Sequence, residues 1–236
     1  MGQAVENKKG QCVKGAAKPL SSPFSLSQNA VFSASYFPLA SGKLAEIEFY
    51  EPLFTAKVGI MTIYFTADLH LHHEHIIRYA HRNPPFRHID DMDRELIRNW
   101  NSVTKNSDKI YHLGDFCFTD DSNVYGRAMR KLHGRKVFLR GNHDNGLQNA
   151  DYYIWCWIDG MKIFMRHWPP WYHPLRFPHS FCIPVDVDLI LCGHVHDKWK
   201  FHVHKVGRRL IPVINVGVDV WGYKPVNLNT IIEELK

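Results

Sequence analysis

Residues 62–70 read Thr-Ile-Tyr-Phe-Thr-Ala-Asp-Leu-His, an apolar run that passes directly into an aspartate and a histidine. The run Thr62–Ala67 has the length and the aromatic and β-branched content of a buried strand. Asp68 and His70 follow where this strand ends. Because residues two apart in an extended chain point to the same side, we expect both side chains to reach one cleft.

Four downstream segments repeat this arrangement of a strand followed by polar residues. The expected strands cover residues 109–113, 136–139, 161–166 and 188–192. They are followed, in order, by Gly114-Asp115, Gly141-Asn142-His143-Asp144, His167 and Gly193-His194-Val195-His196. In layered α/β folds ligands gather at the carboxyl ends of strands, because the loops converge there. We therefore expect these side chains to line one crevice, with the glycines allowing sharp turns or close approach.

Helices, a hairpin and a last strand complete the expected fold. Apolar residues at spacings of three and four predict helices, and Asp159-Gly160 between two apolar runs predicts a tight hairpin. The expected elements are a helix begun near Asp90, a helix at 124–132 closed by Gly134, hairpin strands at 152–158 and 161–166, and a strand at 210–216. This order indicates an α/β fold, with a mixed sheet core covered by helices.

The composition is that of an ordinary globular protein. The 236 residues are 45% hydrophobic and 22% charged, which excludes a disordered or fibrous chain. No stretch approaches 18 consecutive apolar residues, so we expect no membrane-spanning helix. The net charge of +6 is compatible with phosphates or nucleic acid as partners without requiring them. The 16 histidines are unusual, because histidine is the commonest metal ligand.

The chain changes character at Met61. Residues 1–60 contain no His, Trp, Arg or Asp, and we interpret them as an N-terminal extension that is poorly ordered and non-catalytic, although their serines leave a transit peptide open. Residues 61–236 are then the functional domain. The odd set of five cysteines lacks a C-x-x-C pair, which predicts buried free thiols and a reducing, cytoplasmic location.

Carboxylate, imidazole and amide groups are ligands that suit Zn, Fe, Mn or Ni rather than Ca. Seven such groups are too many for one tetrahedral ion and suit two ions that share a bridging carboxylate. The ordered motifs D-x-H, G-D, G-N-H-D, a lone H and G-H-x-H run from Asp68 to His196. This set resembles the calcineurin-like metallophosphoesterases, in particular their small bacterial or phage members. The resemblance implies a four-layer αββα sandwich with two mixed β-sheets and two metal ions at the sheet ends.

The resemblance also assigns a role to each motif residue. Ligands of one ion would be Asp68, His70 and His196, ligands of the other Asn142, His167 and His194, and Asp115 would bridge them. His143 resembles the family's non-ligand histidine, which donates a proton or stabilises the transition state. One departure is Arg166 before His167, where the family often has Gly or Ser.

The implied activity is hydrolysis of a phosphate ester, with a phosphodiester favoured, by attack of a metal-bridging hydroxide. Manganese is the favoured metal, and Fe, Zn and Ni are alternatives. The expected substrate is a phosphorylated small molecule or nucleotide, and nucleic acid stays open as a partner. The alternatives are a phosphomonoesterase, a nucleotide pyrophosphohydrolase, or a non-catalytic binding module that retains the fold.

Several residues near the motifs have two interpretations. Asp144 either orients a neighbouring group or caps a turn. The aromatic residues among 168–173 either stack on a base or aryl leaving group or pack a loop. Five histidines around the first loop and helix are expected on the solvated surface, with a substrate contact open for His72 or His73. They are His72, His73, His75, His81 and His88. His202 and His204 alternate on an expected strand and are predicted to be non-catalytic.

Overall fold

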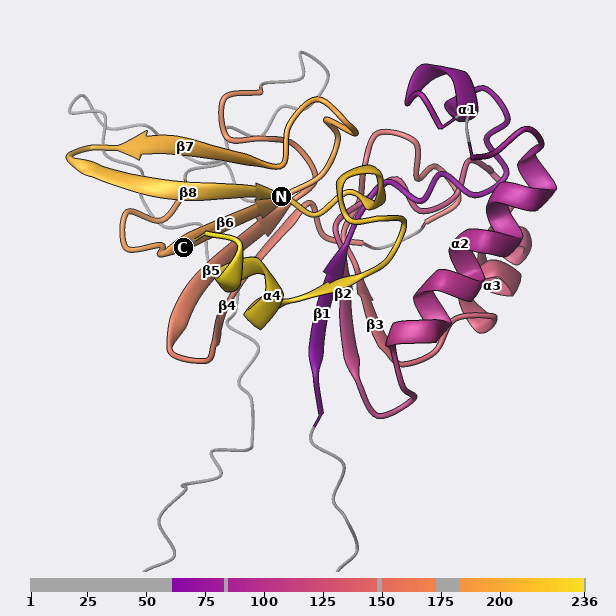
Figure 1. Cartoon of the computed structure of the whole chain (residues 1–236). Coiled ribbons are helices and arrows are strands. Elements are labelled where there is room, and N and C mark those ends of the chain that lie inside the picture. Colours follow the sequence, from indigo (N-terminus) through magenta and orange to yellow (C-terminus); the bar gives the residue numbers. More distant parts are fainter. Residues whose placement is uncertain (1–60, 83–84, 148–149, 173–182, 236) are drawn as a thin grey trace, which may run out of the picture. The chain divides into compact units, whose positions relative to one another are not determined.

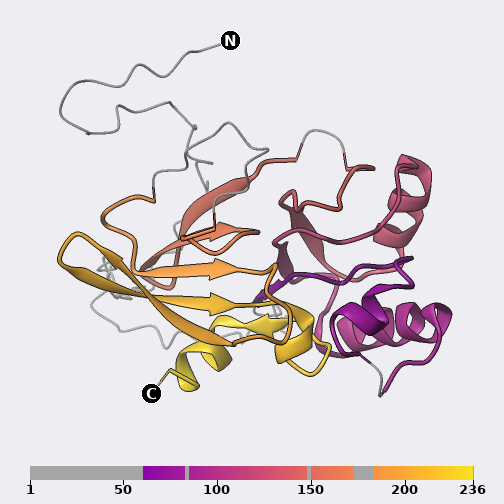
Figure 2. The same ribbon diagram turned by 90° about the horizontal axis from the view of Figure 1, so that it is seen from above.

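The computed structural model describes residues 61–82, 85–147, 150–172 and 183–235, which form two β-sheets and several helices (Figure 1; Figure 2). The extension, residues 1–60, lies outside the described residues, so its predicted lack of order and of catalytic role stays a prediction. Three of the five cysteines are described, Cys117, Cys156 and Cys192, and all three are free thiols, as expected.

The first sheet has the strand order β3-β2-β1-β9. Its strands are β1 (Ile63–Thr66), β2 (Lys109–His112), β3 (Arg135–Phe138) and β9 (Val226–Asn227). β1, β2 and β3 are parallel, and β9 runs antiparallel to β1. β1, β2 and β3 confirm strands expected from the sequence. The two-residue β9 was not expected, because it is too short to carry a periodic pattern.

Helices cover one face of the first sheet, on the side away from the second sheet (Figure 1). They are α1 (Ile76–Tyr79), α2 (Ile89–Val103) and α3 (Ser122–Arg130). The apolar stripe of α2 buries Met92, Leu96 and Trp100 in one cluster with Ile110 of β2. Burial of each such side chain stabilises the fold by about 1.5–3 kcal/mol. The expected helices near 90 and 124 are confirmed as α2 and α3.

The second sheet has the order β4-β5-β6-β8-β7 and is also mixed. Its strands are β4 (Tyr153–Ile158), β5 (Met161–Arg166), β6 (Leu189–Cys192), β7 (Phe201–Val206) and β8 (Arg209–Asn215). The parallel strands β5, β6 and β8 lie between antiparallel edge strands. Asp159 and Gly160 have φ of 48° and 78° between β4 and β5. These positive values are what a tight two-residue hairpin requires, so the hairpin prediction is confirmed.

The two sheets pack face to face. Phe65 and Tyr111 of the first sheet share a buried cluster with Ile163, Leu191 and Ile214 of the second. The short helix α4 (Leu228–Glu233) adds side chains to this cluster. The α/β fold with two mixed sheets is therefore confirmed. No helix within the described ranges contributes to the cluster on the outer face of the second sheet, so the fourth layer of the expected αββα sandwich is not among these elements.

Strand ends from both sheets meet at one edge. Ala67, just after β1, forms a parallel bridge with Gly217, just after β8. The amide of Asp68 donates to the Gly114 carbonyl at 3.0 Å, and the amide of Val218 donates to the Ala67 carbonyl at 3.1 Å. These bonds tie together loops from three strands. In the part of the chain that is described, no helix is long and apolar enough to cross a membrane.

Candidate metal centre

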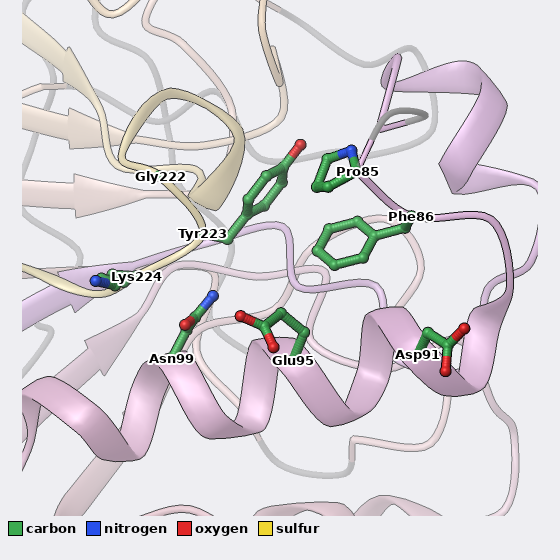
Figure 3. Close-up of a pocket in the computed structure, with 8 residues that line it drawn as sticks. All are labelled: Pro85, Phe86, Asp91, Glu95, Asn99, Gly222, Tyr223 and Lys224. Carbon is green, nitrogen blue, oxygen red and sulfur yellow. The ribbon is translucent and has the colours of Figure 1, made fainter.

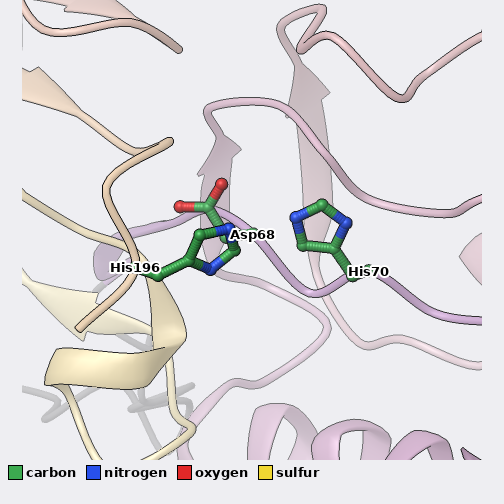
Figure 4. Close-up of side chains that lie close together, drawn as sticks. All are labelled: Asp68, His70 and His196. Carbon is green, nitrogen blue, oxygen red and sulfur yellow. The ribbon is translucent and has the colours of Figure 1, made fainter. Parts of the chain in front are cut away.

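The structure brings six of the motif residues together in two groups at this edge. Asp68, His70 and His196 form the first group, and Asp115, His167 and His194 form the second. Within each group the ligand atoms lie within 4.8 Å of one another. Figure 4 shows the carboxylate of Asp68 beside the ring of His196, with His70 on the same loop as Asp68. Loops after four strands of two different sheets therefore supply these donors.

Asn142 connects two donors within the second group, and Asp115 connects the second group to the first. The Oδ1 atom of Asn142 lies 3.1 Å from Nε2 of His167 and 3.0 Å from Nδ1 of His194. The Oδ2 atom of Asp115 lies 3.3 Å from Nε2 of His167 and 3.4 Å from Nε2 of His70. Its Oδ1 atom accepts the His143 amide at 2.8 Å, which fixes the carboxylate. Asp115 thus faces one member of each group, where the resemblance places a bridge.

Hydrogen bonds orient two of the histidines. Nδ1 of His167 lies 2.9 Å from the Leu113 carbonyl, and Nδ1 of His196 lies 2.9 Å from Oδ2 of Asp219. When Nδ1 donates to an oxygen, the lone pair of Nε2 is left as the metal-binding atom. When either ring is neutral, its Nδ1 contact therefore favours the tautomer that a metal needs.

The backbone at the donor positions differs from the extended chain expected from the sequence. Asp68 and His70 have φ of 59° and 52°, and His194 and His196 have φ of 73° and 49°. Asp115 has φ of 57°. We expected extended chain, in which residues two positions apart point to the same side. That expectation is wrong at these positions. The left-handed conformation turns these side chains toward one another, at a cost of about 1–3 kcal/mol for each residue.

Close approach explains the glycines beside the donors. A Cβ atom at Gly141 would collide with Oδ1 of Asp115, and one at Gly193 would lie 2.6 Å from Oδ2 of Asp68. A Cβ atom at Gly217 would lie 2.7 Å from the same Asp68 oxygen. Backbone thus packs directly on both carboxylates. The roles of Gly141 and Gly193 were expected from the motifs, and that of Gly217 was not.

Asp144 holds the Asp115 loop to the Asn142 loop. Its carboxylate accepts the amides of Asp115, Phe116 and Gly141 at 2.7–2.8 Å and the Tyr125 hydroxyl at 3.2 Å. The side chain is buried, so these bonds replace its hydration. Of the two interpretations of Asp144, orientation of neighbouring groups is the one the structure supports.

A buried ion pair behind the site was not predicted from the sequence. The guanidinium of Arg82 is fully buried, and its Nε donates to Oδ1 of Asp219 at 2.7 Å. Arg82 also donates to the carbonyls of Asp68 and Leu69 at 2.5 and 3.0 Å. Arg82 thus fixes the backbone of one donor and, through Asp219, the ring of His196. Neither residue stands in a motif, so the sequence offered no signal for them.

The electrostatics of the site favour positive charge. Burial raises the pKa of Asp68 to about 6. Burial alone would also raise the pKa of Asp115, but the imidazoles of His167 and His70 hold it below its ordinary value. Burial alone would lower the pKa of His167, but the Asp115 carboxylate raises it to about 9. The buried carboxylates thus favour a cation in the site. A bound divalent ion would supply this positive charge and would release the proton that His167 otherwise holds.

The donor atoms fit metal ions. Nε2 of His70 is buried without a hydrogen-bond partner, although it faces the Asp115 carboxylate. A buried unpaired nitrogen is costly, and coordination of a cation would satisfy it. Burial lowers the pKa of His70 well below its ordinary value, and burial with the nearby His167 lowers the pKa of His194 to about 3. Both rings are therefore neutral, the state that binds metal.

His143 lies beside the two groups without belonging to either. Its ring centroid is 5.2 Å from that of His70, and its side chain is half-buried. Among the other histidines, His72, His75, His81 and His88 are exposed, as expected. His73 is not, because its ring is buried 5.4 Å from His70, with Nδ1 atoms 3.4 Å apart. The expectation of a surface position for His73 is wrong.

The aromatic run after His167 divides between packing and exposure. Trp168 is buried and its ring lies 5.0 Å from that of His167, so it packs the loop. Trp171 and Tyr172 are exposed, and the Tyr172 ring lies 4.6 Å from that of His194. The packing interpretation is therefore confirmed for Trp168, and the partly exposed Trp171 ring also packs on His202, with centroids 4.4 Å apart. His173, the last residue of this run, lies outside the described residues.

A separate cavity of about 540 Å³ lies between α2 and the loop that precedes β9 (Figure 3). None of its lining residues is a candidate metal ligand. They are Pro85, Phe86, Asp91, Glu95, Asn99, Gly222, Tyr223 and Lys224. Asp91 and Glu95 form ion pairs with Arg94 and Arg98 of the same helix, so their charge is already paired. This cavity therefore plays no part in the metal centre.

Replacing Asp219 with asparagine tests the hydrogen bonds that orient the candidate ligands from outside the two groups, here called the outer contacts. The variant removes the carboxylate that orients His196 and leaves Arg82 without its counter-charge, so we expect metal affinity to fall by roughly 10–100-fold. Isothermal titration calorimetry of the metal-free protein with Mn²⁺ measures this affinity. Asp197→Asn is the matched control, because Asp197 is exposed and pairs with the exposed ring of His81. Equal affinities for the two variants would contradict the orienting role of Asp219.

Comparisons with known proteins found similar solved structures. No protein-family model matches the chain. A solved structure of AQ665 from Aquifex aeolicus, a protein of unknown function, superposes with a TM-score of 0.51 and 28% identity over 75% of this chain and all of that one. A solved structure described as a novel archaeal phosphodiesterase has a TM-score of 0.36 and 20% identity over 66% of this chain and 84% of that one.

A curated relative matches this chain in sequence over most of its length. The uncharacterized protein MJ1445 of Methanocaldococcus jannaschii is 33% identical over 181 residues. The match covers 75% of this chain and 92% of MJ1445. Identity at this level over nearly the full length of the relative shows common descent, and the chain belongs to the same protein family as MJ1445.

Proposed function

We propose that the protein is a dinuclear metal-dependent phosphoesterase of the calcineurin-like type, with phosphodiesters as favoured substrates. One observation carries the proposal. Two groups of three side chains that could each hold a metal ion lie at the same edge of two sheets, and the Asp115 carboxylate faces a histidine of each group. The order of the motifs along the chain supports the same function independently.

The favoured metal is Mn²⁺, with Fe, Zn and Ni as alternatives. Two bound divalent ions would activate a water molecule as the nucleophile and would supply positive charge for the phosphoryl oxygens. The residues that would hold one ion are Asp68, His70 and His196. Those for the other are Asn142, His167 and His194, with Asp115 shared. Hydrogen bonds to the Leu113 carbonyl and to the Asp219 carboxylate orient His167 and His196, and Arg82 donates to Asp219.

His143 would donate a proton to the leaving oxygen. Its amide is held by Asp115 and its ring stands beside His70, outside both groups. A group in this position can contact the substrate without giving up its nitrogen to a metal. The reaction needs no covalent enzyme intermediate, because water is the nucleophile.

Removal of metal should reduce hydrolysis of phosphate esters to background. The protein is stripped with a chelator and then supplied with Mn²⁺, Fe²⁺, Zn²⁺, Ni²⁺ or Mg²⁺ in turn. Turnover is measured on bis(4-nitrophenyl) phosphate and on 4-nitrophenyl phosphate. We expect Mn²⁺ to restore activity and the diester to react faster.

Each other outcome has a distinct meaning. Undiminished turnover by the stripped protein would contradict the two-metal mechanism. Faster reaction of the monoester would indicate a phosphomonoesterase. Tight metal binding with no hydrolysis of either ester, or of a dinucleoside polyphosphate, would support the non-catalytic binding module.

A further inference from the structure

An exposed aromatic ring stands beside the candidate proton donor. Phe118 follows Phe116 and Cys117, which are buried at 0% and 1% exposure, yet its own side chain is 45% exposed. Its ring is stacked on that of His73, with centroids 4.2 Å apart and an interplanar angle of 19°. The ring of His143 lies 5.5 Å away. The rings of Phe118, His73 and His143 thus form one cluster next to His70, of which the Phe118 ring is exposed.

The backbone holds Phe118 in this exposed position. Its amide donates to the Leu71 carbonyl at 2.8 Å, and Cys117 forms a parallel bridge with Leu71. Beneath it, the buried ring of His73 fills the space against His70. A single exposed apolar side chain is ordinary on a protein surface. A ring that is fixed on both its backbone and one face, at the edge of a candidate active site, is a preformed stacking surface.

The position of Phe118 relates to the proposed proton transfer. A proton donor must contact the leaving oxygen, so the leaving group lies on the side of the site where His143 stands. Phe118 lies on that side. Tyr172, the exposed aromatic residue next to His194, contacts a member of the other donor group. The exposed aromatic ring nearest the leaving group is therefore that of Phe118, which the buried ring of His73 supports.

We propose that Phe118, backed by His73, binds a flat aromatic part of the leaving group, so that the substrates are phosphodiesters carrying a nucleobase or an aryl group. This inference rests on the proposed function and specifies its substrate class. Stacking on an aromatic side chain suits any flat ring, because every base has a π-face. Selectivity for aromatic over aliphatic esters follows, without selectivity among the bases.

Binding of two matched probes tests the inference without turnover. Adenosine 5′-monophosphate and ribose 5-phosphate share the sugar and the phosphate and differ by the base. We expect the Mn²⁺-loaded protein to bind the nucleotide about 5- to 150-fold more tightly, the range of one stacked base. Phe118→Ala should remove this difference, whereas Phe118→Trp should keep it. Calorimetry measures both affinities.

Trp157→Ala is the control for loss of an exposed aromatic ring. Trp157 is 62% exposed and lies opposite Lys162 in the β4–β5 strand register, near the turn. This is the end of β5 away from His167. This variant should bind both probes as the unaltered protein does. Equal affinity of the unaltered protein for the two probes, or a difference that survives Phe118→Ala, would overturn the inference. Melting temperatures of all variants check that the fold is kept.

Hydrolysis separates this inference from the proposed function. Kinetics on bis(4-nitrophenyl) phosphate and on glycerophosphocholine, an aliphatic diester, should show that Phe118→Ala raises KM for the aryl ester and leaves the aliphatic ester unchanged. If the protein hydrolyses diesters but binds both probes equally, the proposed function stands and only the aromatic subsite is contradicted. A protein that prefers the nucleotide but hydrolyses no phosphate ester keeps the subsite and contradicts the proposed enzyme.

Discussion

Asp115→Ala should lose both metal ions and reduce turnover to the level of the metal-free protein. The Asp115 carboxylate faces His70 of one donor group and His167 of the other, so its removal takes a negative ligand from both ions at once. The loss of metal affinity should exceed the roughly 10–100-fold that is lost when a hydrogen-bond partner of a ligand is removed. Elemental analysis of the purified variant, beside turnover on bis(4-nitrophenyl) phosphate, measures both effects.

Two further variants make the Asp115 result interpretable. Asp115→Asn keeps the shape and an acceptor for the His143 amide, so it should fold even where alanine disturbs the loop. It should still bind fewer ions, because a neutral amide is a weaker ligand than a carboxylate. Asp120→Ala removes a carboxylate from the same loop, outside both donor groups, and should change neither quantity. Full metal content in Asp115→Asn, with normal turnover, would contradict the bridging role.

His143→Ala should keep both ions and lose about 10²–10⁴-fold in turnover, the range that general acid catalysis supplies. The ring lies outside both donor groups, so its removal takes no ligand from a metal. The loss should be smaller for an ester with a nitrophenolate leaving group, which needs little protonation. Elemental analysis, together with turnover on an aryl and an alkyl ester, tests both expectations.

The control for His143 is His88→Ala. His88 is exposed and its side chain makes no capping bond to α2, so metal content and turnover should be unchanged. Loss of an ion in His143→Ala would make His143 a ligand. An equal loss for the two leaving groups would show that the side chain stabilises charge and does not donate the proton.

The sequence was sufficient for the elements with strong local signals. The apolar period of α2 and the Asp159-Gly160 turn each depend on interactions between residues close in the chain, and both appear in the structure. The sequence also placed the motif residues at strand ends. Parallel strands deliver their carboxyl ends to one edge, and the structure brings these residues together there.

Only the tertiary structure showed how these side chains face one another. The D-x-H and G-H-x-H spacings suggested extended chain, but Asp68 and His194 are in the left-handed conformation. This strain persists because the two loops hold each other. The amide of His194 donates to both carboxylate oxygens of Asp68 at 3.1 and 2.9 Å. A pattern of neighbouring residues contains no information on such long-range bonds.

The outer contacts depended on the tertiary structure for the same reason. Arg82 and Asp219 are 137 positions apart and belong to no motif, yet their ion pair orients His196 and fixes the backbone of Asp68. The sequence by itself determined which residues carry the candidate chemistry, since residue type and order along the chain are local properties. Their orientation, burial and shared charge were decided by packing of the two sheets, which brings together segments that the chain keeps far apart.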